Sequence, residues 1–244
     1  MGKIIKFLLS VLLAPLIYSF VYEACFYLIS NIKFKSIIWF IGGLLLYLFL
    51  YISIFLNRGR FLYTIIFFEH LEHELGHSLV GFMFLRGTRK LIANPRKEHE
   101  NEETSKVEFL EPRRPNFLIS LAPYYLPVLT VPLLVAEPLA FFPLHEVIDF
   151  MIGFTLAFHF VGLLREFSLK QETDIKPNGL IFSFCVTCLL NTIFLVVALC
   201  VVSSNYTGIL SYFKSSIART PESYQTALQT LMILNDLKDQ LLQQ

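Results

Sequence analysis

Charged residues are scarce in this sequence. Asp, Glu, Lys and Arg make up 16% of its 244 residues and hydrophobic residues 55%, whereas a soluble domain has about 25% charged residues. The mean hydropathy is +0.60. A soluble fold would have to bury several apolar runs of about 20 residues, the length that crosses a bilayer. The composition therefore indicates a protein with several segments in a membrane.

An excess of positive charge is lacking as well. The 20 Lys and Arg residues are balanced by 19 Asp and Glu residues. The basic residues are divided among loops and do not gather on one face. We therefore expect no nucleic-acid partner.

Cysteines are few, and all lie in apolar surroundings. They are Cys25, Cys185, Cys188 and Cys200. Cys185 and Cys188 form a Cys-x-x-Cys pattern, but the sequence has no second such pair to complete a structural zinc site. We interpret both as small apolar side chains that pack within a helix.

Long apolar runs predict an all-α fold, a polytopic transmembrane helix bundle with about six membrane segments. They lie at roughly 7–30, 36–56, 61–85, 117–136, 139–165 and 179–203. The first run resembles a signal sequence but lacks a small-x-small cleavage site, so we interpret it as an uncleaved span. The fourth contains Pro123, Pro127 and Pro132, which predicts a broken or re-entrant segment.

One long charged loop, residues 86–116, interrupts the apolar runs. It carries eight Lys or Arg and six Glu, so we expect it outside the membrane. Short strands are predicted around Lys90–Ala93 and Lys106–Leu110.

Basic residues also predict the topology. With six crossings, the segments 31–35, 86–116 and 166–178 share one side, and together with Arg165 at the border of the last they hold thirteen Lys or Arg. The positive-inside bias places that side in the cytoplasm and both chain termini on the opposite side. The sequence thus predicts a multi-pass integral protein of the cell membrane.

Composition divides the chain into two parts. Residues 1–204 form a membrane domain with its core at about 61–204, and residues 205–244 form a polar C-terminal tail. In the tail, Thr220 before Pro221 is a helix start signal. Apolar residues recur behind it at helical spacing, which predicts an amphipathic helix.

The segment 73–77, which reads His-Glu-Leu-Gly-His, carries the strongest chemical signal. Histidines four residues apart lie on one helix face, so His73 and His77 can bind one metal ion with Glu74 beside it. In zinc hydrolases such a glutamate is the general base that takes a proton from water. His70 lies one turn earlier and is expected to support the site. Because ionisable groups are costly in an apolar run, we predict a Zn2+ site here.

A third protein ligand must come from elsewhere in the chain. The soluble metzincin pattern is excluded, because it requires a glycine and a histidine where this chain has Val80 and Met83. The downstream candidates are Glu166, Glu172, Asp174, His145 and His159.

The first motif, continued as Ser-Leu-Val-Gly after His77, resembles the site-2 protease family of intramembrane zinc metalloproteases. The family's second motif, an aspartate followed shortly by glycine at the start of a later core helix, is similar to Gln171–Gly179. The resemblance implies Asp174 as the third zinc ligand and residues 1–204 as the metalloprotease domain. It implies an endopeptidase that cleaves a peptide bond in or near a transmembrane segment of a membrane-protein substrate. Both motifs border the side that the charge bias places in the cytoplasm.

Two alternatives remain open. Membrane zinc proteases of the CAAX-processing and heat-shock type use the same first motif with a glutamate as third ligand, and Glu172 before Asp174 echoes their pattern. A non-catalytic metal-binding membrane protein, such as a transporter or sensor, would also use the two histidines but has no need of Glu74. The sequence makes no prediction of the oligomeric state.

Overall fold

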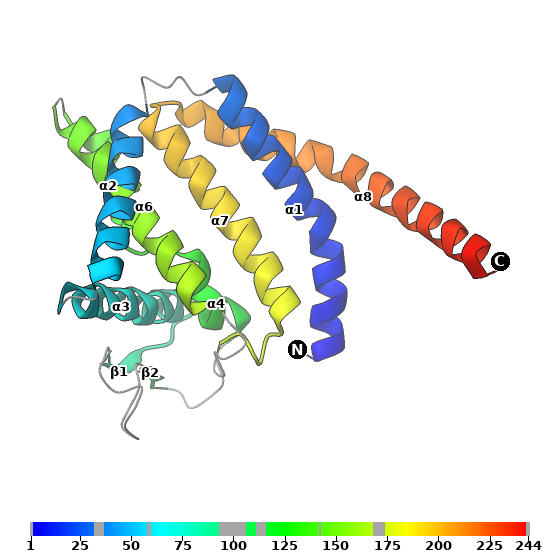
Figure 1. Ribbon diagram of the computed structural model, residues 1–244, viewed down its shortest axis with the longest axis horizontal. Coiled ribbons are helices and arrows are strands. Elements are labelled where there is room, and N and C mark those ends of the chain that lie inside the picture. The colour runs from blue at the N-terminus through cyan, green and yellow to red at the C-terminus, as the bar shows by residue number, and fades with distance from the viewer. Residues whose placement is uncertain are drawn as a thin grey trace.

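In the residues that the structure describes, the chain forms a bundle of helices with one short β-hairpin (Figure 1). The computed structural model describes residues 2–31, 37–57, 60–92, 106–110, 116–141, 143–167 and 174–242. In chain order the elements are α1 (Lys3–Asn31), α2 (Ile38–Asn57), α3 (Arg60–Met83), β1 (Thr88–Ile92), β2 (Lys106–Phe109), α4 (Phe117–Tyr125), α5 (Thr130–Ala136), η2 (Glu137–Leu139), α6 (Leu144–Glu166), α7 (Leu180–Val202) and α8 (Tyr206–Leu242). The expectation of a mainly helical fold is confirmed.

Within the described ranges, four helices are long and apolar enough to cross a membrane: α1 over Ile4–Tyr27, α2 over Ile38–Leu56, and the whole of α6 and α7. A fifth crossing results if α4 and the bent segment that follows it count as one span. The described part of the chain thus has the helices of an integral membrane protein. The predicted segment 61–85 forms α3, which is not among these candidate spans because three glutamates lower its hydropathy. The count of six membrane segments therefore stays a prediction.

The expected break in the fourth apolar run lies at Pro127. Leu126 follows α4 with an extended backbone, φ −102° and ψ 104°, because the ring of the next proline crowds the helical conformation of the residue before it. Beyond the break the chain axis is bent by 74°. Residues Ile119–Tyr125 of α4 are all buried, so protein surrounds the interrupted backbone.

Helices α2 and α6 pack backbone to backbone through two glycines. A Cβ atom on Gly43 would lie 1.9 Å from the carbonyl oxygen of Phe150, and one on Gly153 would lie 1.9 Å from that of Phe40. Small residues permit such close approach between membrane helices, where association depends on van der Waals packing. A larger residue at either glycine would push the two helices apart.

Helix α3 runs across one end of the bundle in Figure 1, whereas α1, α2, α6 and α7 run along it. Its closest partner is α4, the short buried helix. The two helices meet where Gly76 faces Pro123, since a Cβ atom on Gly76 would lie only 3.1 Å from the Cα atom of Pro123. This contact fixes the 73–77 turn against the interior of the bundle.

We call the end of the bundle where α3 lies the α3 end, and the opposite end the far end. At the α3 end, the Lys6 ammonium of α1 donates to the carbonyl oxygen of Pro177 (2.9 Å), in the turn before α7. At the far end, Asn205 Nδ2 donates to the hydroxyl of Tyr27 (2.8 Å). The prediction that the N-terminus lies opposite the segment 166–178 is therefore wrong. Because α3 lies across the bundle end and does not cross it, α1 and α2 run in the reverse of the predicted directions.

The charged loop begins and ends in an antiparallel hairpin beside α3. Leu91 of β1 lies opposite Val107 of β2, and the hydroxyls of Ser78 and Thr88 share a hydrogen bond of 2.6 Å that joins the hairpin to α3. Both predicted strands are confirmed.

Helix α8 begins well before the predicted start at Thr220 and continues through Pro221, so that prediction is wrong. Its first half packs on α1: Tyr212 is 2% exposed, and its ring meets that of Phe20 edge to face at 5.7 Å between centroids. Packing of this kind stabilises helical structure even where the local sequence carries no signal for a helix start. The amphipathic character of the tail stays a prediction.

Candidate metal centre

Two histidines of α3 and one aspartate converge at the α3 end of the bundle. The Nε2 atoms of His73 and His77 lie 3.2 Å and 3.4 Å from Oδ2 of Asp174. One possible ligand atom from each of the three residues lies within 4.8 Å of the others. The structure thus brings together the three residues that the sequence predicts as ligands. Asp174 lies in the turn that precedes α7.

These separations suit a zinc ion. Tetrahedral zinc holds nitrogen and oxygen ligands at about 2.0–2.2 Å, which places the ligand atoms roughly 3.3–3.5 Å from each other. The two separations between imidazole and carboxylate, 3.2 Å and 3.4 Å, are close to that spacing. Two imidazoles and one carboxylate leave the fourth position open, as in catalytic zinc sites. Magnesium and calcium prefer oxygen ligands alone, so the donor set fits zinc better.

The outer nitrogens of both rings have hydrogen-bond partners that orient them. His77 Nδ1 lies 2.8 Å from the carbonyl oxygen of Ile119, and His73 Nδ1 lies 2.5 Å from Oε2 of Glu166. Because both partners are acceptors, they hold the proton on Nδ1 and leave the Nε2 lone pairs free for a metal. His70, expected to support the site, lies 3.8 Å from the other oxygen of Glu166.

A proline makes the carbonyl of Ile119 available. In a continuous helix this carbonyl would accept from the N–H of residue 123, but Pro123 has none. His77 Nδ1 donates in its place. Gly76 permits the approach, because its missing side chain leaves room for the Pro123 backbone. The glycine within the 73–77 motif and the proline of α4 therefore determine together where His77 lies.

Glu74, between the two histidines in the sequence, is 4% exposed. Its Oε2 atom is buried and has no hydrogen-bond partner among the described residues. A buried carboxylate oxygen without a partner is costly, so such atoms commonly mark a place for water or ligand. Glu74 can therefore accept a proton at this site, as a general base must.

Asp174 is held in its charged form. Burial disfavours the charge, but in the metal-free site hydrogen bonds and positive charge from the imidazoles of His73 and His77 outweigh burial and keep the pKa of the Asp174 carboxyl well below its usual range. A bound metal ion would replace the Nε2 protons in that role. The Asp174 carboxylate is therefore ionised at neutral pH, the state that binds a metal. The hydroxyl of Tyr124 also approaches Oδ2, at 3.5 Å.

A second polar network, around His159, lies next to the metal-ligand cluster, which consists of His73, His77 and Asp174. His159 Nδ1 is 3.9 Å from Oε1 of Glu72, and His159 Nε2 is 3.2 Å from Oδ1 of Asn191. Asn191 Nδ2 donates to the carbonyl oxygen of Tyr124 (2.7 Å), and the N–H of Leu129 donates to Glu72 (3.5 Å). His159, a candidate third ligand, thus bridges α3 and α7 and does not join the cluster.

A small polar cavity separates this network from His73. Its volume of about 10 Å3 is roughly the space that one water molecule requires. The residues around it are Glu69, Glu72, His73, Pro123, Tyr124, His159, Gly162, Leu163 and Glu166. Sequence reasoning missed Asn191 and the role of Glu72, although the glutamates were visible as costly groups in an apolar run.

The remaining candidates lie elsewhere. His145 is at the far end, where its Nδ1 atom is 3.0 Å from Oε1 of Glu137. Glu172, the alternative third ligand, lies outside the described residues. Cys185 and Cys188 form no disulfide, and neither belongs to the metal-ligand cluster.

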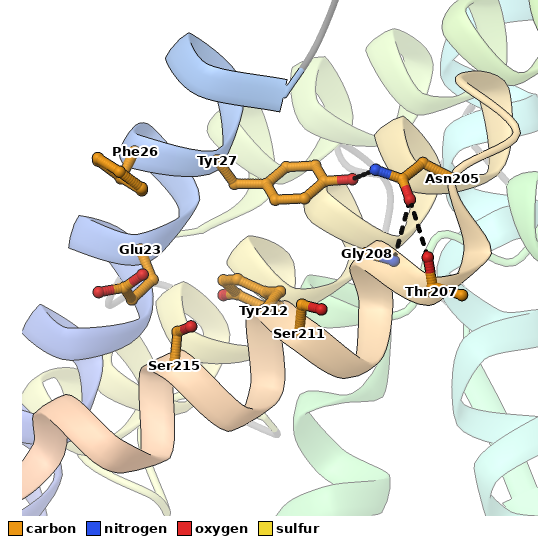
Figure 2. Close-up of a pocket in the computed structure, with 9 residues that line it drawn as sticks. All are labelled: Glu23, Phe26, Tyr27, Asn205, Thr207, Gly208, Ser211, Tyr212 and Ser215. Carbon is orange, nitrogen blue, oxygen red and sulfur yellow. Dashed lines mark hydrogen bonds between the residues drawn. The ribbon is translucent and has the colours of Figure 1, made fainter.

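A larger cavity, of about 250 Å3, lies at the far end between α1 and α8 (Figure 2). Its lining residues are Glu23, Phe26, Tyr27, Asn205, Thr207, Gly208, Ser211, Tyr212 and Ser215. The carboxylate of Glu23 is paired with Arg219 Nε at 2.5 Å. Because this lining has no histidine and no second acidic residue, it lacks the groups that metal-dependent hydrolysis needs.

Among the residues that the structure describes, His73, His77 and Asp174 are the one group of three His, Cys, Asp or Glu side chains that could hold a metal ion. The group joins α3 to the turn before α7, and α4 and α6 supply the bonds that orient it. The comparisons with known proteins find no protein family, no curated protein and no solved structure that matches this chain.

Proposed function

We propose that the protein is an intramembrane zinc metalloendopeptidase, which cleaves a peptide bond in or near a transmembrane segment of a membrane-protein substrate. The convergence of His73, His77 and Asp174 at one end of a bundle of apolar helices carries the proposal. The resemblance of the two motifs to those of the site-2 protease family supports it.

Each residue of the site then has a role. A bound zinc ion would supply Lewis-acid activation of a water molecule and of the scissile carbonyl. Glu74 accepts the proton from the water and returns it to the departing amide nitrogen. Glu166 and the carbonyl of Ile119 hold the two imidazoles in one tautomer and one orientation.

The substrate must present an unwound segment to this site. A helix hides its carbonyl groups in internal hydrogen bonds, and hydrocarbon offers no alternative partners. We therefore expect cleavage near residues that weaken a helix, such as glycine, proline or asparagine.

We infer that the α3 end faces the cytoplasm. In the sequence, fifteen of the twenty Lys and Arg residues belong to segments that begin or end at helix ends on this side of the bundle: two near the start of α1, two in 58–60 around the start of α3, eight in 86–116 between α3 and α4, and three in 165–176 between α6 and α7. The positive-inside bias favours the cytoplasm for that end.

We also infer that α3 is the sixth membrane segment, embedded at the border of the bilayer. Its outer side carries exposed apolar residues, among them Phe68 at 50% and Phe82 at 72%. Aromatic residues concentrate where hydrocarbon meets the headgroups. The catalytic turn would then lie where both water and an unwinding substrate can reach it.

The variant Glu74→Gln tests the catalytic role. Purified full-length protein in vesicles would be supplied with single-span test substrates that carry glycine or Asn-Pro within the span. We expect wild type to cleave such a substrate and Glu74→Gln to cleave it at least ~100-fold more slowly, while both proteins bind zinc. Mass spectrometry of the products measures the cleavage.

The control is Glu222→Gln, which makes the same chemical change at a side chain that is 74% exposed on α8. It should cleave at the wild-type rate. Unchanged cleavage in Glu74→Gln would contradict the mechanism. Movement of zinc across the vesicle membrane without cleavage would instead indicate a transporter.

A further inference from the structure

A lysine of the first helix reaches the turn that carries the third ligand. Lys6 is 9% exposed, and its ammonium donates to Oδ1 of Asn178 (2.7 Å) and to the carbonyl oxygen of Pro177 (2.9 Å). A lysine near the end of a membrane helix commonly extends toward water. This one points into the protein, where a buried ammonium is tolerated only with such acceptors.

Asn178 connects Lys6 to Asp174, the proposed metal ligand. Its Nδ2 atom donates to the carbonyl oxygen of Asp174 (2.6 Å) and to the hydroxyl of Ser120 in α4 (2.6 Å). Both amide hydrogens therefore have acceptors within the protein. The Lys6 ammonium on Oδ1 determines which side of the amide faces Asp174, because an ammonium can only donate.

The turn needs such support because regular helix does not hold it. Residues 174–178 form consecutive turns and α7 starts only at Leu180. Gly179 adopts φ +86°, a conformation that favours glycine. Within the turn, the N–H groups of Asn178 and Gly179 donate to the carbonyl oxygen of Ile175, which is fully buried. The side chain of Asn178 adds a bond to the backbone of Asp174 itself.

We propose that Lys6 is a positioning residue of the metal centre, which acts through Asn178 to hold the Asp174 carboxylate within reach of both imidazoles. The inference rests on the proposed metal centre and extends it, since it makes α1 part of that centre. It does not depend on peptidase activity.

Zinc affinity of the purified full-length protein, measured by competition with a chelator, tests this role. We expect Lys6→Met, which keeps the length of the side chain and removes its charge, to weaken zinc binding by roughly 10–100-fold, the range for residues that orient a metal ligand. Lys6→Arg should restore most of the affinity. Lys3→Met removes the same charge from α1 and should bind zinc as wild type does.

A double-mutant cycle distinguishes positioning from a general structural role. If Lys6 acts through Asn178, the double variant Lys6→Met with Asn178→Ala should bind zinc no more weakly than Asn178→Ala alone. Independent, additive losses would overturn the proposal. Loss of unfolding cooperativity in metal-free Lys6→Met, without recovery of zinc affinity in Lys6→Arg, would also overturn it and assign Lys6 to the fold alone.

The outcome for wild type separates this proposal from the one it builds on. If wild type fails to bind zinc tightly, the metal centre itself is wrong. If wild type binds zinc tightly and Lys6→Met binds it equally well, only the role of Lys6 is wrong.

Discussion

Both ends of the bundle bury charged side chains, but these side chains are paired in different ways. At the far end, Glu137 accepts from the hydroxyl of Tyr206 (2.8 Å) and lies 3.0 Å from His145 Nδ1. Glu23 is likewise paired with Arg219. These contacts join neighbouring helices in pairs, and none forms a group of three possible metal ligands among the described residues.

At the α3 end, the side chains share one point. His73 and His77 both turn Nε2 toward Asp174, while their Nδ1 atoms bond outward. Glu74 keeps a buried oxygen without a partner beside them. Burial of charge alone therefore does not distinguish a site from a structural contact. Convergence of donor atoms, together with partners that orient them from behind, does so.

Among the changes that test this difference between the two ends of the bundle, removal of a metal ligand should have the largest effect. His77→Ala and Asp174→Ala each leave two protein ligands, so we expect both to lose tight zinc binding and cleavage. His145→Ala removes an imidazole from the far end and should retain both. Elemental analysis of zinc per purified chain measures the difference, and equal zinc in His77→Ala and His145→Ala would contradict it.

Removal of a supporting carboxylate should have the next largest effect. Glu166→Gln replaces the acceptor on His73 Nδ1 by a neutral amide, and we expect zinc affinity to fall roughly 10–100-fold. Glu137→Gln, the same change on the carboxylate that faces His145, should leave zinc affinity unchanged. Chelator competition at fixed pH compares the two variants. An undiminished affinity in Glu166→Gln would mean that His73 is oriented by other contacts.

Two glycine substitutions distinguish close packing that stabilises the fold from close packing that positions the metal centre. Gly43→Ala forces α2 away from α6 and should lower the free energy of unfolding by about 1–3 kcal/mol, with zinc affinity of the folded protein unchanged. Gly76→Ala meets a looser contact, 3.1 Å from Pro123, and should shift His77 and weaken zinc binding by less than Glu166→Gln does. Denaturant unfolding and chelator competition on both variants test the pair, and a reversed pattern would refute it.

The smallest effect is expected from surface charge. Glu222 forms an exposed pair with Arg219 at 3.9 Å. Exposed pairs of this spacing contribute only about 0.3–0.5 kcal/mol. Glu222→Gln should therefore change the unfolding free energy by no more than that and leave zinc binding untouched. A loss above about 1 kcal/mol in denaturant unfolding would show that far-end charges matter more than their exposure suggests.

The parts of the fold that the sequence predicts are those with strong local patterns. Long apolar runs reveal the helices, and Pro127 reveals the break, because a proline acts on its immediate neighbour. The start of α8 was missed because the signal at Thr220 is local, whereas the packing of Tyr212 on α1 is not. The topology was wrong for the same reason, since an apolar run does not tell whether a helix such as α3 crosses the bundle or lies across its end.

The same division holds within the metal centre. His73, Glu74 and His77 follow from helical spacing, since four residues bring side chains to one face. Asp174 required a family resemblance, because no local rule relates it to a helix about 100 residues earlier. The Ile119 carbonyl and Lys6 left no sequence signal of their own. Their roles depend on a hydrogen bond removed by Pro123 and on the approach of α1 to the turn before α7.

X-ray absorption at the zinc edge of the loaded wild-type protein tests the central claim most directly. We predict scattering from two imidazoles and additional oxygen at about 2.0–2.2 Å, with one imidazole contribution lost in His77→Ala. Scattering from sulfur at about 2.3 Å, or a spectrum that His77→Ala leaves unchanged, would contradict the account.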